Sequence, residues 1–200
     1  ERLYACVRSF DLGPARDALV ARLKPRVETL KVAPSTDPDA HYGPLVTAEH
    51  KKKVLNYIEM GVKEGAKLLV DGRNYKDPKN PNGYYLGPTL FDDVTPEMTI
   101  AREEIFGPVL AVLPFDGVDE AVALANRSAY GLAAGVWTKD VQKAHRVARA
   151  VRAGTVWVNT YNVYDSAAPF GGTKSSGFGR DLGREALDGY LETKSVWVAL

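Results

Sequence analysis

The sequence contains a single cysteine, Cys6, and only three histidines among 200 residues. One cysteine cannot form an internal disulfide, and it cannot supply the several thiolates of a structural zinc site. This scarcity predicts a reducing compartment, either the cytoplasm or the interior of an organelle. No metal site is expected.

An excess of charge of either sign is also missing, because 26 lysine and arginine residues oppose 25 aspartate and glutamate residues. A net charge of +1 gives no overall field that would attract nucleic acid or anionic lipid. No apolar run approaches the roughly 18 residues of a membrane span, and the first residues lack the apolar region of a signal peptide. Neither nucleic acid nor a membrane is therefore an expected partner.

Strands and helices alternate from residue 107 onward. Apolar residues at helical spacing predict helices at 118–126 and 141–151, and the segments around them predict strands at 109–115, 132–138 and 155–159. Strands joined by helices of this length imply right-handed crossovers in a parallel sheet. The sequence predicts an α/β fold with a parallel open sheet and flanking helices.

The remaining segments are less regular. Earlier in the chain, helices are expected at 15–30 and 47–65, followed by a short strand at 67–70 and a solvated loop. A last helix is expected from about Leu182. A terminal strand is expected at 193–199, where polar and apolar residues alternate.

Two adjacent carboxylates, Glu103 and Glu104, precede Phe106 and Gly107 just before the strand predicted at 109–115. One interpretation is a solvated charged turn with Phe106 in the core. The other is a carboxylate at the edge of a cleft, where it accepts hydrogen bonds from the vicinal hydroxyls of a ribose beside an aromatic ring. The motif alone leaves both open.

The long loop at 160–179 is rich in glycine and in aromatic residues. Its aromatic content argues against simple disorder, because disordered segments contain few aromatic residues. Within it, Phe170 precedes Gly171 and Gly172. This motif is typical of a tight turn, or of one wall of a small-molecule pocket lined by Phe170. Its spacing matches neither a Walker loop nor the glycine-rich dinucleotide fingerprint.

Taken together, these motifs resemble the aldehyde dehydrogenase superfamily. Five segments occur in the family's order and approximate spacing: 43–46, 103–109, 131–134, 154–159 and 169–177. The resemblance covers essentially the whole chain and matches the C-terminal, catalytic-domain portion of a typical member. It implies a catalytic-type domain over 1–190 and a C-terminal strand, 191–200, used in subunit contacts of a dimer or tetramer. The cofactor-binding half would precede Glu1.

The resemblance also implies roles for single residues. Glu104 would bind the nicotinamide ribose of NAD or NADP, with Phe106 near the nicotinamide and His50 and Lys53 approaching the ribose from another side. Asn159, Gly171 and Gly172 would be structural. Four residues would line the pocket of the small-molecule aldehyde: Tyr161, Asn162, Tyr164 and Phe170.

The position of the nucleophile is a difficulty. In the family a reactive cysteine precedes, by five residues, the arginine of a segment that Arg8-Ser9-Phe10 resembles, and this count reaches Leu3. A gapless count back from Gly43 reaches the same residue. Leucine cannot attack an aldehyde, and Cys6 is either a small buried residue or a weak candidate nucleophile.

Three functional hypotheses follow. The first is the catalytic-domain part of an NAD(P)-dependent aldehyde dehydrogenase that oxidises an aldehyde to a carboxylate. The second is a catalytically silent relative, marked by Leu3, and the third is a structural assembly module. Because the family's oxyanion asparagine and general-base glutamate would both precede Glu1, the isolated chain is expected to be inactive.

Overall fold

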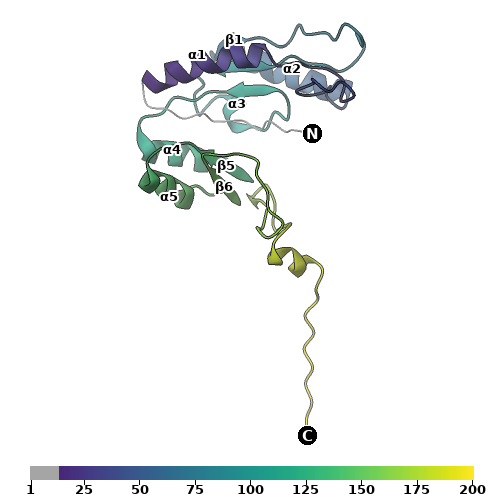
Figure 1. Cartoon of the computed structure of the whole chain (residues 1–200), viewed down its shortest axis with the longest axis vertical. Helices are drawn as coiled ribbons and strands as arrows, with labels where there is room; N and C mark the ends of the chain where they lie inside the picture. The colour runs from purple at the N-terminus through teal and green to yellow at the C-terminus, as the bar shows by residue number, and fades with distance from the viewer. Residues whose placement is uncertain (1–13) are drawn as a thin grey trace. The chain divides into compact units, whose positions relative to one another are not determined.

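The computed structural model describes residues 14–200, which divide into two compact units at the boundary between Gly117 and Val118. Each unit combines its own helices with short strands (Figure 1). The predicted α/β class is therefore confirmed. None of the helices in the described range is long and apolar enough to cross a membrane.

A three-stranded mixed sheet forms the centre of the first unit. Strand β2 (Thr89–Asp92) lies between β1 (Lys67–Val70), which is antiparallel to it, and β3 (Val109–Ala111), which is parallel. All four residues of β2 are buried. The sheet is thus mixed at its β1 edge.

Two long helices cover the two faces of this sheet. Helix α1 (Pro14–Glu28) packs Val27 against Leu90, and helix α2 (Ala48–Lys63) belongs to the larger core cluster that includes Phe91. Successive residues of a strand point to opposite faces, so β2 needs an apolar side chain on both sides. This explains why β2 is buried throughout.

The pairing of β3 differs from the expectation. The alternating pattern predicted one parallel sheet running from the strand at 109–115 to those at 132–138 and 155–159. In the described structure β3 pairs with β2, whereas β5 (Ala133–Val136) and β6 (Thr155–Val158) pair with each other. The physical reason is β2, a strand too short and too uniformly buried to show any periodicity.

Helix α2 begins and ends as its sequence predicts. The Thr47 hydroxyl accepts a hydrogen bond from the backbone N–H of His50 at 3.1 Å, which caps the first turn. Gly65 follows the helix with φ +95°, a backbone conformation that favours glycine. Its buried face presents Val54, Tyr57, Ile58 and Gly61.

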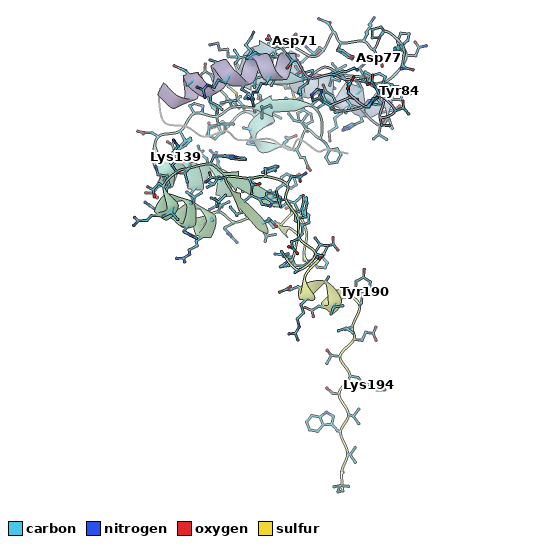
Figure 2. All side chains as sticks on the ribbon, in the orientation of Figure 1. Asp71, Asp77, Tyr84, Lys139, Tyr190 and Lys194 are labelled. Carbon is cyan, nitrogen blue, oxygen red and sulfur yellow. The ribbon has the colours of Figure 1, made fainter. Side chains whose placement is uncertain are left out.

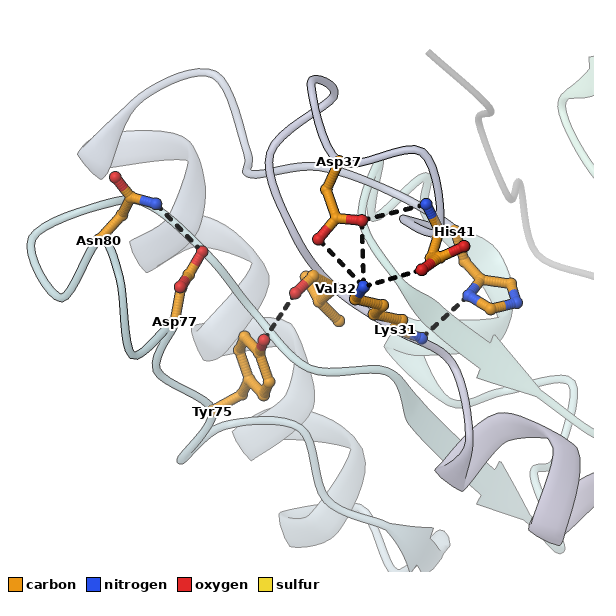
Figure 3. Close-up of polar contacts among 8 residues, drawn as sticks. Lys31, Val32, Asp37, His41, Tyr75, Asp77 and Asn80 are labelled. Carbon is orange, nitrogen blue, oxygen red and sulfur yellow. Dashed lines mark hydrogen bonds and ion pairs between the residues drawn. The ribbon is translucent and has the colours of Figure 1, made fainter.

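The loop predicted after β1 is solvated but well anchored. Figure 3 shows Tyr75 donating from its hydroxyl to the Val32 carbonyl at 2.6 Å, and Asp77 accepting from the Asn80 side chain. Asp77 also accepts from the backbone N–H of Lys79, and this bond lowers the pKa of the Asp77 carboxyl. The Tyr75 bond therefore holds the loop against the segment that follows α1, and the Asp77 bonds shape the loop itself.

The second unit is built on β5 and β6, with helix α5 (Val141–Ala150) packed on both strands (Figure 1). Helix α4 (Gly117–Asn126) precedes them. A short antiparallel pair, β4 (Tyr130–Gly131) with β7 (Thr173–Lys174), ties the long glycine-rich loop back to the start of β5.

The end of the chain differs from the expectation in two respects. The last helix is a short 3-10 helix, η1 (Arg184–Gly189). The terminal segment 191–200 has no sheet partner among the described residues, and its Trp197 side chain is 94% exposed. Figure 2 shows Tyr190 at the end of η1 and Lys194 along the extended segment that follows.

Candidate functional site

The first candidate site is the segment 103–107, which we call the carboxylate turn. It follows the short helix α3 (Thr99–Arg102) and leads into β3. Ile105 is buried in the core cluster, whereas Glu104 is exposed and the Phe106 side chain is 44% exposed. The interpretation that placed Phe106 in the core is therefore wrong, because Ile105 fills that position.

His50 binds the last part of the carboxylate turn. Its Nε2 lies 2.6 Å from the Phe106 carbonyl oxygen, and since a carbonyl only accepts, the imidazole donates. The two rings lie edge to face with centroids 6.0 Å apart. Phe106 has φ +58°, a left-handed conformation that is rare for a bulky side chain.

Tyr57 binds the first part of the same turn. Its hydroxyl donates to Glu103 Oε2 at 2.7 Å. The Lys53 ammonium lies 5.7 Å from the centroid of the Tyr57 ring, within the range of a cation–π contact. The structure therefore gathers the predicted cofactor residues of this unit around α2 and the turn.

Sequence reasoning missed Tyr57 and Val54 in this arrangement. A Cβ added to Gly107 would lie 2.8 Å from both Cγ atoms of Val54, so the turn packs directly on that residue. The signal was present, because positions 50, 54 and 57 follow the i, i+4, i+7 spacing of one helix face.

The second candidate site lies in the second unit and consists of five aromatic rings in sequential contact. Trp157, at the end of β6, is 8% exposed and contacts Tyr161 and Tyr164 at centroid distances of 4.8 and 5.7 Å. Phe170 contacts Tyr164 at 5.0 Å, and Trp137 stacks on Tyr161 at 6.3 Å. We call this set the aromatic cluster.

The predicted pocket residues all belong to this cluster or touch it. Asn162, with φ +62°, accepts a hydrogen bond from the Tyr164 hydroxyl at 2.6 Å. Burial raises the pKa of the Tyr161 phenol, and the nearby Tyr164 adds to this increase. Sequence reasoning missed Trp137 and Trp157, because each lies in or beside a predicted strand.

The three residues predicted to be structural lie where the chain turns sharply. The Asn159 side chain accepts from the Thr138 N–H at 2.8 Å and donates to the Thr138 carbonyl at 2.9 Å, joining the ends of β5 and β6. A Cβ on Gly171 would lie 2.6 Å from the Gly179 carbonyl oxygen, and one on Gly172 equally close to that of Ser176. Only glycine permits these approaches.

The remaining predictions concern metals and the nucleophile. No group of three or more histidine, cysteine or acidic side chains suited to a metal ion occurs within the described range. Leu3 and Cys6 lie outside the described residues.

Comparison with known proteins gives one consistent result. A model of the aldehyde dehydrogenase family matches residues 5–196. The chain is 50% identical, over 92% of its length, to a putative aldehyde dehydrogenase DhaS of Bacillus subtilis, of which it spans 36%. It is also 50% identical, over 96% of its length, to a betaine aldehyde dehydrogenase of Sinorhizobium fredii, of which it spans 39%.

A solved structure agrees with these relatives. The fold superposes on an aldehyde dehydrogenase from Bacillus cereus, solved as an NAD+ complex, with a TM-score of 0.88 and 48% identity. The match covers 96% of this chain and 38% of that one. The chain thus spans well under half the length of the proteins it matches.

Asn159 provides a test of the second unit. Replacing Asn159 with glycine removes both side-chain hydrogen bonds to Thr138 and should lower the free energy of unfolding by about 1 kcal/mol. Replacing it with alanine should lower it by about 1 kcal/mol more, because φ is +54° at this position. Urea unfolding followed by tryptophan fluorescence measures both changes. Equal stability of the two variants would contradict a contribution from the backbone conformation.

Proposed function

Since the chain belongs to the aldehyde dehydrogenase family, we propose that it is the C-terminal, catalytic-domain part of an NAD(P)-dependent enzyme that oxidises an aldehyde to a carboxylate. In this proposal residues 1–190 form a catalytic-type domain and 191–200 an assembly strand. The observation that carries it is the carboxylate turn, which presents Glu104 and Phe106 on the surface while its neighbour Ile105 is buried.

The residues of the turn suit a nicotinamide dinucleotide. An exposed carboxylate such as Glu104 can accept hydrogen bonds from both vicinal hydroxyls of a ribose, and the half-exposed Phe106 ring offers an apolar surface to a planar base. Lys53 adds an exposed cation nearby. When bound, the nicotinamide would accept the hydride that leaves the aldehyde carbon.

Glu104→Gln in the full-length protein tests this role. The substitution keeps the shape and removes the charge, so it should weaken NAD+ binding by about 1 to 2 kcal/mol, because hydrogen bonds to charged groups contribute about 1.5 to 3 kcal/mol and those between neutral groups about 0.5 to 1.5 kcal/mol. Calorimetric titration with NAD+ measures the dissociation constant. Glu59→Gln, the same change at an exposed position on α2, is the matched control and should leave the constant unchanged.

Two outcomes would change the proposal. Unaltered NAD+ affinity in Glu104→Gln would reject the carboxylate as a ribose ligand. Tight NAD+ binding by the unsubstituted full-length protein with no aldehyde turnover would support the silent relative instead, the alternative that rests on Leu3 at the nucleophile position.

For the substrate we propose an aldehyde with a quaternary ammonium group. Several relatives, including the one from Sinorhizobium fredii, are named betaine aldehyde dehydrogenases. The aromatic cluster supports this choice, because Tyr161 and Tyr164 are 49% and 50% exposed and aromatic faces attract quaternary ammonium ions. The buried Trp157 contacts both rings.

Tyr164→Leu separates charge recognition from shape. In the full-length protein it should raise KM for betaine aldehyde by roughly fivefold or more, on the scale of one cation–π contact. KM for 3,3-dimethylbutanal, the neutral isostere, should change much less. Tyr164→Phe keeps the ring face and should stay close to the parent for both aldehydes. An equal rise in KM for the two substrates in Tyr164→Leu would contradict recognition of the cation.

We further propose that the terminal segment 191–200 joins subunits of a dimer or tetramer. Its apolar side chains have no partner strand among the described residues, and an unpaired strand with apolar residues invites pairing with another chain. The large exposed apolar residues of the segment are Leu191, Val196, Trp197, Val198 and Leu200.

Removing residues 193–200 from the full-length protein should therefore convert the assembly to monomer or to aggregate. Light scattering coupled to size exclusion measures the mass. Lys194→Ser, which changes a polar residue of the same segment, is the control and should keep the parent mass. A truncated protein with the parent's mass and solubility would show that the segment is no assembly element.

A further inference from the structure

The carboxylate turn holds a conformation that its own residues do not favour. Phe106 has φ +58°, although it carries a bulky side chain and nearly half of that side chain is exposed. A residue with a Cβ adopts this conformation at a cost in free energy, so the surrounding structure must impose it. Backbone strain of this kind concentrates at functional sites.

One face of α2 makes three contacts that hold the carboxylate turn in this conformation. His50 hydrogen-bonds the Phe106 carbonyl at 2.6 Å, and Tyr57 hydrogen-bonds the Glu103 carboxylate at 2.7 Å. Between them Val54 is fully buried and packs directly against Gly107. Residues at i, i+4 and i+7 lie along one side of a helix. This side of α2 therefore contacts the turn at Glu103, at Phe106 and at Gly107.

We propose that His50, Val54 and Tyr57 are positioning residues that fix the carboxylate turn so that Glu104 and Phe106 face the cofactor. The inference rests on the proposed function and adds residues that act through the turn. It assigns His50 a role through the Phe106 carbonyl, in place of the direct ribose contact that the family resemblance implied. Tyr57, which is 8% exposed, is too buried to touch a ligand itself.

The experiment compares NAD+ dissociation constants of variants of the full-length protein by calorimetric titration. Tyr57→Phe removes only the hydroxyl, and His50→Ala removes the imidazole while the backbone N–H of residue 50 still binds Thr47. Each should raise the dissociation constant about three- to tenfold, the scale of one net hydrogen bond. His50→Gln should restore part of the affinity, because a carboxamide N–H can still donate to the Phe106 carbonyl.

Tyr75→Phe is the matched control. It removes a tyrosine hydroxyl that donates to the backbone carbonyl of Val32, in the same unit and outside the carboxylate turn (Figure 3). It should leave the dissociation constant unchanged. Combining Tyr57→Phe with Glu104→Gln should give less than the product of the two single effects, because both act through one turn.

The outcomes separate this inference from the proposed function. If Glu104→Gln weakens NAD+ binding and Tyr57→Phe does not, the positioning role is overturned and the cofactor site stands. If Glu104→Gln, Tyr57→Phe and His50→Ala all leave the dissociation constant unchanged, the proposed cofactor site itself is rejected. A loss of affinity in Tyr57→Phe no larger than in Tyr75→Phe would likewise overturn the positioning role.

Discussion

The first unit depends on how closely α2 approaches the segment 100–107. Two glycines permit this approach: a Cβ on Gly61 would lie 2.9 Å from Ile100 Cδ1, and one on Gly107 would meet Val54. Interiors pack at the density of organic crystals, so a single added methyl group must displace a neighbour. Because Ile100 and Ile105 are buried by this contact, the short helix α3, the carboxylate turn and the start of β3 are all positioned by one helix face.

In the second unit, side-chain hydrogen bonds to the backbone fix the positions of the loops. Its strands are short and form few backbone hydrogen bonds with one another. Side chains therefore supply additional hydrogen bonds to its loops. Asn159 joins the ends of β5 and β6, and the Trp157 indole donates to the Val163 carbonyl at 2.9 Å. The Lys174 ammonium donates to the carbonyls of Asn126 and Ser128 at 3.0 Å. Within the aromatic cluster, Trp157 combines its ring contacts with its one polar bond to the Val163 backbone.

Sequence reasoning predicted the elements whose apolar residues repeat at a regular spacing, and it missed those without such a repeat. Helix α2 was predicted with its cap at Thr47 because its apolar residues repeat at helical spacing. Strand β2 was missed, since both of its faces are covered and no alternation remains. The parallel pairing of β5 with β6 follows the predicted strand–helix–strand pattern. The partner of β3 could not be predicted, because β2 was missed and strand order depends on contacts between distant segments.

The same limit applies to the candidate sites. The exposed members, Glu104, Phe106 and Tyr164, were found through motifs and the family resemblance. Tyr57 and Trp157 were missed because, in sequence, they are ordinary members of a helix and a strand. Their contribution arises from what they touch across the fold, which one sequence without its contacts does not display.

Phe106 shows two requirements that oppose each other at one position. Its left-handed backbone would suit glycine or asparagine better, and either would relieve the strain. Only an aromatic residue, however, presents a flat apolar ring at this point of the surface. The chain thus keeps a residue that is suboptimal for stability, which is the trade-off expected where selection acts on a surface property more strongly than on the fold. A search for more stable variants would favour a small residue at position 106 and remove the ring.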